Sequence, residues 1–305
     1  MADERFRLFD YHTQTIEHGL AKPRRVNETV QAAIEAGLSS ICLTDHFPLP
    51  LGYEDPTDEK DCAMAFSDYP KYQQEVDNAT RKYGAYINIL RGAEFDWISG
   101  YELWTHEQVN AWPFDYVIGS VHLLGQIEDE RGKRNLILDY KQEEFQRGID
   151  YFGGIRPLGE TYYQEVRAMV ESGLFDGVGH LDLIKKFNDG TIFSENQSWY
   201  QEAVLATLAT IAESGMSIEI NTAGWDKKCQ DAYPSLWILR EARLRGIPLT
   251  TGSDAHVPEN IGRNLDRAIE LAKSAGFNHL VEYRRHRQIA VPLNKSDYHY
   301  AFEED

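Results

Sequence analysis

The chain has 305 residues, and 31 Lys and Arg against 49 Asp and Glu give it a formal net charge of −18. With 42% hydrophobic and 12% aromatic residues, the composition suits a packed core and argues against an intrinsically disordered protein. The acidic balance argues against a nucleic-acid-binding surface, which depends on clustered positive charge. No apolar run reaches the roughly 20 residues that a membrane-spanning helix requires.

Cysteine usage and the first residues of the chain predict its compartment. The three cysteines, Cys42, Cys62 and Cys229, are odd in number and widely spaced, which favours thiols in a reducing cytoplasm over a disulfide framework. The first residues mix charges and lack the apolar segment of a secretory signal. We therefore expect a soluble, cytoplasmic protein.

Short β-rich runs alternate with helical segments along the chain. The strands are expected to end near Tyr11, Thr44, Glu94, His122, His180, Asn221 and Ser253, with a further strand at 279–283. The helices are expected over residues 26–37, 68–84, 141–151, 158–173, 197–215, 234–246 and 259–276. The turn-rich segments 47–67 and 124–139 are expected to be long excursions at strand ends. This alternation predicts an α/β protein with a parallel sheet, closed into a TIM-like barrel, and one domain over residues 1–305.

Histidines and acids gather at the predicted strand ends. They are His12, Asp45, His46, Glu94, His122, His180, Glu219, Asp254 and His256. In a barrel of parallel strands these ends converge on one face, where imidazoles and carboxylates would repel one another or stay unpaired without a cation among them. Because the set contains no cysteine, it favours Zn, Mn or Fe ions over thiolate sites. The set has more residues than the three or four ligands of one catalytic zinc, so it predicts two or three divalent ions.

The ordered motifs resemble those of one enzyme superfamily. They are Asp10-Tyr-His-Thr-Gln-Thr, Thr44-Asp-His, Gly92-Ala-Glu, Ser120-Val-His, Gly179-His-Leu-Asp and Gly252-Ser-Asp-Ala-His. Together they resemble the polymerase and histidinol phosphatase (PHP) superfamily, and within it the histidinol-phosphate phosphatases most closely. The resemblance runs from about residue 10 to residue 262 and implies a distorted (β/α)7 barrel that holds three divalent metals.

The resemblance also implies a set of ligands for each ion. The expected sets are His12, Glu94 and Asp254 for one ion, Glu94, His122 and His180 for a second, and His18, His46 and His256 for a third. One departure concerns Gln14, which stands where the family has the second histidine of a His-x-His motif. An amide oxygen is a weaker ligand than imidazole, so Gln14 is kept in the ligand set and the number of ions is left at two or three.

The chemistry expected of such a site is phosphoester hydrolysis by metal-bound hydroxide, since bound ions lower the pKa of water and offset phosphoryl charge. Asp45 or Asp182 is the expected proton donor to the leaving group, with orientation of a histidine ligand as the alternative for both. Lys186 is the first candidate for binding the phosphate, followed by Arg263. Lys60 is a further substrate-binding candidate. It lies in a segment, 55–67, that resembles a family loop over the site and could equally be a polar surface loop.

Together, the motifs and the resemblance predict a phosphomonoesterase that hydrolyses L-histidinol phosphate to L-histidinol and phosphate in histidine biosynthesis. A first alternative is the same fold acting on another small phosphoester. A second is a binding or regulatory module that has lost a metal, for which Gln14 is the favouring feature. A proofreading exonuclease is disfavoured by the charge of −18. The sequence leaves the oligomeric state open.

Overall fold

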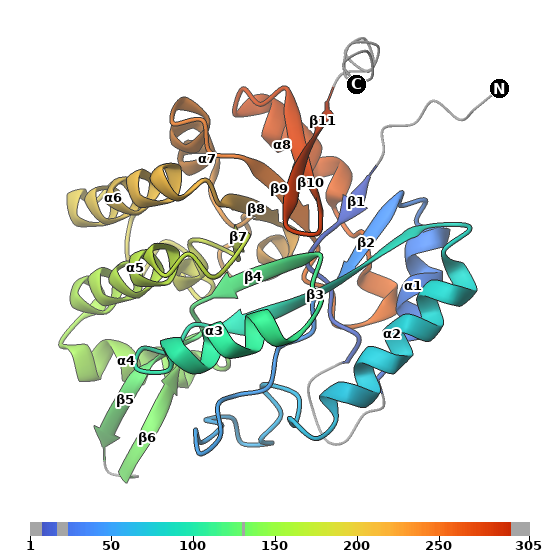
Figure 1. Cartoon of the computed structure of the whole chain (residues 1–305). Helices are drawn as coiled ribbons and strands as arrows, with labels where there is room; N and C mark the ends of the chain where they lie inside the picture. The colour runs from blue at the N-terminus through green and yellow to red at the C-terminus, as the bar shows by residue number, and fades with distance from the viewer. Residues whose placement is uncertain (1–7, 17–23, 130–131, 294–305) are drawn as a thin grey trace.

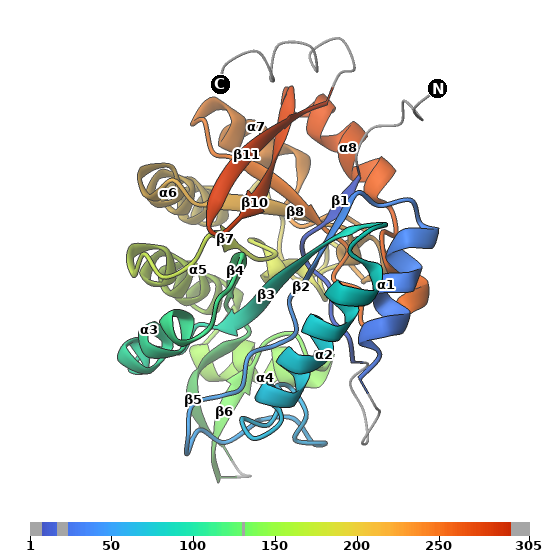
Figure 2. The ribbon, with the colours of Figure 1, turned by 45° about the vertical axis from the view of Figure 1, so that its right-hand side comes forward.

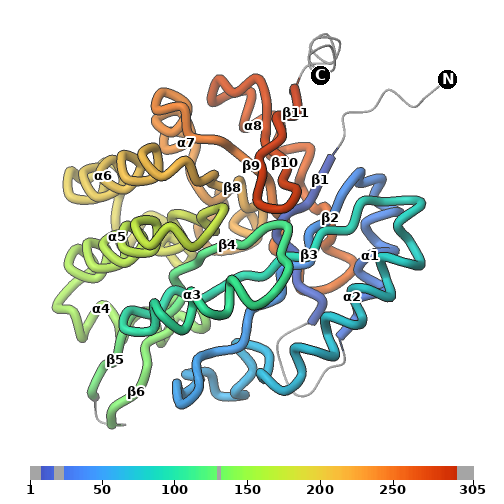
Figure 3. The backbone as a smooth tube through the Cα atoms, viewed as in Figure 1, coloured from blue at the N-terminus to red at the C-terminus, as the bar shows by residue number. Residues whose placement is uncertain are grey.

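The computed structural model describes residues 8–16, 24–129 and 132–293, and their centre is a seven-stranded parallel sheet. Its strands, in spatial order, are β1 (Phe9–Asp10), β2 (Ser40–Leu43), β3 (Asn88–Asp96), β4 (Tyr116–Ser120), β7 (Gly177–Val178), β8 (Ser217–Asn221) and β9 (Leu249–Gly252). The backbone N–H of Tyr11 donates to Thr251 O at 2.9 Å, and Thr13 forms a parallel bridge with Ala255. These contacts place β1 beside β9, so the sheet closes into the predicted barrel (Figures 1 and 3).

The helices lie outside this barrel. They are α1 (Val26–Glu35), α2 (Tyr69–Tyr83), α3 (Glu102–Ala111), α4 (Gln142–Phe152), α5 (Ile155–Glu171), α6 (Ser198–Ser214), α7 (Leu236–Leu244) and α8 (Leu265–Ser274). Figure 2 shows α1 and α2 on one side of the barrel and α5 and α6 on the other. The α6 helix ends at Gly215, whose φ of 76° is the left-handed conformation that favours glycine.

The last predicted helix, 259–276, is too long at its start. Residues Pro258–Asn260 form a separate 3-10 turn, and Asn264 adopts a left-handed φ of 61° before α8 begins. A left-handed residue cannot continue an α-helix, so the two pieces are distinct. The remaining predicted helices are confirmed, with boundaries that differ by a few residues.

The segment 124–139 was predicted to be a turn-rich excursion, and that prediction is wrong for most of its length. It forms two antiparallel strands, β5 (Leu123–Asp129) and β6 (Gly132–Ile137), which project from the barrel (Figure 1). Leu124, Ile127 and Leu136 are buried in the main apolar core, while polar and charged residues between them lower the average hydropathy of the segment. Residues 47–67, all of which the structure describes, form no helix or strand, as predicted.

The strand predicted at 279–283 is confirmed, but it pairs outside the barrel. Strands β10 (His279–Arg284) and β11 (Arg287–Pro292) form an antiparallel hairpin. Its Tyr283 hydroxyl donates to Asp176 O at 2.9 Å and lies 2.8 Å from Ser217 Oγ. Because these partners precede β7 and begin β8, the hairpin covers the end of the barrel where the strands start.

One cluster of buried apolar side chains extends from Phe9 to Leu293 through the barrel and its helices. This continuity supports one domain, which stays a prediction. A smaller cluster of Cys62, Ile98, Leu123 and Ile137 lies between the 47–67 segment and β5–β6. Within the described residues, none of the helices combines the length and the apolar character needed to cross a bilayer.

The hairpin should make stability depend on pH through His286. Its Nδ1 lies 2.9 Å from Asp176 Oδ2, and this hydrogen bond raises the pKa of His286 above the ordinary 6.5. A group whose pKa is raised by folding stabilises the folded state below its unfolded pKa, and that effect is lost as pH rises through the folded pKa. We expect His286→Gln to lower the free energy of unfolding below pH 6.5, and the difference to shrink at higher pH.

Urea unfolding at several pH values measures this difference. The control is His279→Gln, because His279 is exposed on the same hairpin and its Nδ1 contacts the Asn278 amide at 2.8 Å instead of a carboxylate. A difference for His286→Gln that stays constant across this pH range would contradict the prediction.

Candidate metal centre

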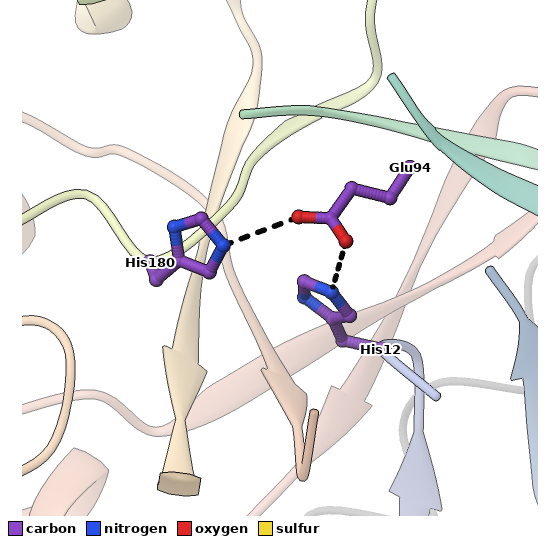
Figure 4. A group of neighbouring side chains, drawn as sticks. All are labelled: His12, Glu94 and His180. Carbon is purple, nitrogen blue, oxygen red and sulfur yellow. Dashed lines mark hydrogen bonds and ion pairs between the residues drawn. The ribbon is translucent and has the colours of Figure 1, made fainter. Parts of the chain in front are cut away.

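Glu94, near the end of β3, lies at the centre of the histidine cluster and is 1% exposed. Its Oε1 is 3.1 Å from His180 Nε2, and its Oε2 is 3.0 Å from His12 Nε2 (Figure 4). The Ser120 hydroxyl donates to Oε1 at 2.6 Å, and His46 Nδ1 lies 3.4 Å from Oε2. Each carboxylate oxygen therefore faces different imidazoles, which is the arrangement of a carboxylate shared between two cation positions.

The charge state of Glu94 follows from these neighbours. Burial alone would raise the pKa of its carboxyl group, but His12, His46 and His122 outweigh burial and hold the pKa well below its usual range. Glu94 is therefore an anion at neutral pH, as a metal ligand must be.

Two further carboxylates orient histidines of the cluster. Both oxygens of Glu219, on β8, lie 3.0 Å from His12 Nδ1, and Asp96 Oδ1 lies 2.7 Å from His122 Nδ1. When Nδ1–H donates to a carboxylate, Nε2 is left as the ligand atom of the ring. Gly252 on β9 permits the first pair, since a Cβ there would lie 2.4 Å from His12 Cβ.

Neither Asp96 nor Glu219 was among the predicted site residues. The available signal was the period of two along a strand, which turns Asp96 toward the same face as Glu94. The strand-end pattern includes Glu219 but predicts no role for it. It is the carboxylate partner that a ligand histidine ordinarily has.

The donor set suits divalent ions. Within the described residues, two groups have ligand atoms that all lie within 4.8 Å of one another: His12, Glu94 and His180, and His46, Asp96 and His122. The Nε2 atoms of His122 and His180 are 3.0 Å apart, so two ligand atoms point into one space beside Glu94. Nitrogen and carboxylate donors without thiolates fit Zn, Mn or Fe, which agrees with the residue types predicted.

Asp254 and His256 follow β9 and complete one side of the cluster. Asp254 adopts a left-handed φ of 52° and places Oδ1 3.6 Å from His12 Nε2. Burial would raise the pKa of Asp254, but His12 and His256 outweigh it and lower that pKa. The Asn221 amide donates to Asp254 Oδ2 at 3.1 Å, which fixes the carboxylate. This strained residue is held in place by its surroundings, as is common at functional sites.

The grouping of ligands differs in part from the expected sets. The ring of His46 lies 5.2 Å from that of His122 and 6.4 Å from that of His256, between centroids. His180 groups with His12 as well as with His122. His18 lies outside the described residues, so the third set stays a prediction.

The structure directs the Asp182 carboxylate away from the histidine cluster. It follows His180 in the turn after β7, and its Oδ2 accepts from the Ser235 N–H at 3.1 Å and pairs with Lys185 Nζ at 2.9 Å. Among the described residues it does not line the cavity beside Glu94. Its position therefore gives no support to a role as proton donor.

Asp45 and Lys60 do not line the cavity beside Glu94 among the described residues. Successive residues after β2 point in opposite directions, so His46 faces Glu94 while Asp45 turns to Arg24, whose Nη1 donates to it at 2.9 Å. Lys60 Nζ contacts Asp55 O at 2.5 Å. In the described part of the chain, both residues line a neighbouring cavity instead of the one beside Glu94.

A cavity of about 470 Å³ opens beside the cluster, and its walls differ in chemistry. One wall holds the ligand-type residues His46, Glu94, His122, Asp254 and His256. The lining also includes three cationic residues, named here the cationic wall, Lys186, Lys227 and Arg263, and three apolar residues, named here the apolar wall, Cys62, Leu123 and Ile137. Asp61, Asp96 and Asp139 line the same cavity. The cavity can therefore accept a small molecule with an anionic and an apolar end.

The cationic wall contains Lys186 and Arg263, two of the three predicted substrate-binding residues, and also Lys227, which was not predicted. Lys186 Nζ pairs with Asp139 Oδ2 at 2.8 Å, and Arg263 Nη2 pairs with Asp226 Oδ2 at 2.8 Å. Partial burial and the charge of Lys186 lower the pKa of Lys227. Lys227 lies in the loop after β8, where no motif distinguished it from its neighbour Lys228.

Comparison with known families decides the assignment. The PHP domain model matches residues 10–223, and a PHP-associated model matches residues 238–270. The chain belongs to the PHP family. Within the described residues, every ligand-type side chain of the cluster falls inside these two matched regions.

Two curated relatives of this PHP protein are named as histidinol-phosphatases. It is 34% identical to a probable histidinol-phosphatase of Deinococcus radiodurans, over 87% of this chain and 92% of that protein. It is 31% identical to a histidinol-phosphatase of Bacillus subtilis, over 85% of this chain and 96% of that protein. The histidinol phosphate phosphatase of Lactococcus lactis, solved with zinc, L-histidinol and phosphate, has the same fold, with a TM-score of 0.72. The two sequences are 22% identical, and the match covers 93% of this chain and 100% of that one.

Proposed function

We propose that this PHP protein hydrolyses L-histidinol phosphate to L-histidinol and inorganic phosphate, as a phosphoric monoester hydrolase of histidine biosynthesis. The observation that carries the proposal is the position of Glu94, shared between two sides of a histidine cluster and next to a cavity with three cationic side chains. The two histidinol-phosphatase relatives, each above 30% identity over most of the chain, support the same reaction.

Two or three divalent ions are the proposed cofactors, with zinc as the first candidate because the Lactococcus relative was solved with it. The residues that would hold them are His12, His46, Glu94, His122, His180, Asp254 and His256. Bound ions of this kind supply a water that is deprotonated near neutral pH and neutralise phosphoryl charge.

The chain's own residues bind and orient the substrate. A phosphate monoester is a dianion, so a protein with a net charge of −18 needs local positive charge to attract it. The proposed ions would supply most of this charge, and Lys186, Lys227 and Arg263 add to it, with Asp139 and Asp226 orienting two of them.

The apolar wall suits the other end of the substrate. Cys62, Leu123 and Ile137 offer a surface on which an imidazole ring can pack, and a sugar phosphate has no comparable apolar part. Thr57, Asp61 and Cys62 bring the 55–67 segment to the edge of the cavity, which supports the proposed role of that segment as a loop over the site.

The test is phosphate release from L-histidinol phosphate compared with sugar phosphates, nucleotides and a phosphodiester. We expect kcat/KM for L-histidinol phosphate to exceed that for every other substrate by at least about 100-fold, or roughly 2.7 kcal/mol in transition-state binding. Higher activity on another phosphoester would favour the first alternative. Bound metal without turnover of any substrate would favour a binding module.

Lys227 offers a sharper test of the cationic wall. We expect Lys227→Met to raise KM for L-histidinol phosphate about 10-fold or more, because a hydrogen bond to a charged group contributes about 1.5–3 kcal/mol. Steady-state kinetics measure the change. The control is Lys228→Met, since the adjacent Lys228 does not line the cavity and donates to Gln142 Oε1 at 2.6 Å. Equal effects of the two variants would argue against a specific role for Lys227.

A further inference from the structure

Gln14 is buried beside Glu94, and both polar atoms of its amide are engaged. The side chain is 1% exposed. Its Oε1 accepts the backbone N–H of His46 at 3.0 Å, and its Nε2 donates to Glu94 Oε2 at 2.9 Å. The orientation of the amide is determined by these partners, because the His46 N–H can only donate and an ionised carboxylate can only accept. In the flipped amide, the Gln14 NH2 group would face the His46 N–H, which is also a donor, and Gln14 Oε1 would face Glu94 Oε2, which is also an acceptor.

The amide makes the two oxygens of Glu94 unequal. Oε1 faces the imidazoles of His180 and His122, at 3.1 and 3.6 Å, and accepts the Ser120 hydroxyl. Oε2 faces His12 and His46 and also accepts the Gln14 amide. Each oxygen of Glu94 therefore accepts one hydrogen bond, but the two donors differ. The Ser120 hydroxyl can rotate and offer its oxygen lone pairs to a cation, whereas the Gln14 NH2 group can only donate. To present its own oxygen to a cation, Gln14 would have to abandon the His46 N–H.

We propose that Gln14 is a hydrogen-bond donor to Glu94 and not a metal ligand, and that it weakens ion binding on the Oε2 side of Glu94. The ion on this side, beside His12 and Asp254, is then held less tightly than the ion beside His122 and His180. The inference rests on the proposed function, because it takes divalent ions to be the cofactors. It assigns unequal affinities to the two ion positions that share Glu94, with Gln14 as the cause.

Metal content against free metal concentration tests this inference. Zinc-loaded protein is dialysed against a graded series of chelator buffers, and ions per chain are measured by elemental analysis. We expect the parent to release its ions in two stages at least about 10-fold apart in free zinc. A single stage for the parent would overturn the proposal.

The deciding variant is Gln14→Met, which keeps the side-chain length and removes both the donor and the oxygen. The proposal predicts that the weaker stage in Gln14→Met occurs at the same or a lower free zinc concentration than in the parent. If the amide oxygen were a ligand, the variant would lose this ion at a higher free zinc concentration, which would overturn the proposal. The control is Gln73→Met, because Gln73 is a buried glutamine on α2 outside the cavity lining and should change neither stage.

A measurement on the unaltered protein covers the case in which Gln14→Met does not fold. With 15N-labelled glutamine, the buried Gln14 NH2 group should give an NMR signal protected from solvent exchange that persists when zinc is added. Loss of protection on zinc binding would mean that the amide turns its oxygen toward the ion, and the proposal would be wrong. If the parent protein bound no zinc at all, both this inference and the proposed function would be wrong. If only Gln14→Met lost an ion, this inference would be wrong and the proposed function would stand.

Discussion

Glu94→Gln should lower kcat/KM for L-histidinol phosphate by at least about 1,000-fold, or roughly 4 kcal/mol. The expected cause is loss of a negative charge that faces imidazoles on both sides, with Oε1 3.1 Å from His180 Nε2 and Oε2 3.0 Å from His12 Nε2. Since metal-assisted catalysis supplies several kcal/mol of charge stabilisation, weaker binding of the ions removes most of the rate.

Kinetics and elemental analysis of the same sample measure both effects, and we expect fewer ions per chain in Glu94→Gln than in the parent. The matched control is Glu165→Gln on α5, because Glu165 accepts the Trp97 indole N–H at 3.0 Å and lies outside the lining of the cavity in the described residues. Glu94→Gln with the parent's metal content and activity would refute the shared-carboxylate assignment.

Lys185→Met should destabilise the fold by about 3–5 kcal/mol, the usual result of removing one partner from a buried ion pair. Lys185 is 1% exposed, and its Nζ lies 2.9 Å from Asp182 Oδ2 and 2.9 Å from Asp231 Oδ2. Burial already raises the pKa of Asp182 to about 6, although Lys185 opposes this rise. Without the lysine, the Asp182 carboxylate loses its nearest cation while it stays buried.

Denaturant unfolding at neutral pH measures this loss. Activity per folded molecule should be retained, because Lys185 is not among the described residues that line the cavity. The control is Lys141→Met, in which an exposed ion pair to Asp58 is removed and we expect a change below about 1 kcal/mol. A similar small change in Lys185→Met would show that the buried pair contributes little to stability.

The barrel and the location of the site were predictable from local patterns. Alternation of strand and helix is visible in the order of apolar residues, and histidines or acids at strand ends mark the face where parallel strands converge. The pattern failed at β5–β6, where polar residues between Leu124, Ile127 and Leu136 concealed two strands. It also failed at Asn264, whose left-handed φ of 61° separates the 3-10 turn from α8.

The site was predictable as a set of residues but not as a set of contacts. His46 and Asp45 are adjacent in the sequence, yet one faces Glu94 and the other pairs with Arg24. Asp182 follows a ligand histidine by two residues, yet it pairs with Lys185. Sequence spacing limits where such side chains can go, but their partners come from distant parts of the chain.

The sequence by itself therefore determined the fold class, the residue types of the metal cluster and its place at the strand ends, because these follow from periodicity and from the chemistry of imidazole and carboxylate. The tertiary structure alone decided that Glu94 is shared, that Glu219 orients His12 and that the Gln14 amide faces Glu94. The physical reason is that a hydrogen bond depends on a few ångströms of separation and on donor direction, and these are set only when strands from separate parts of the chain pack into one barrel.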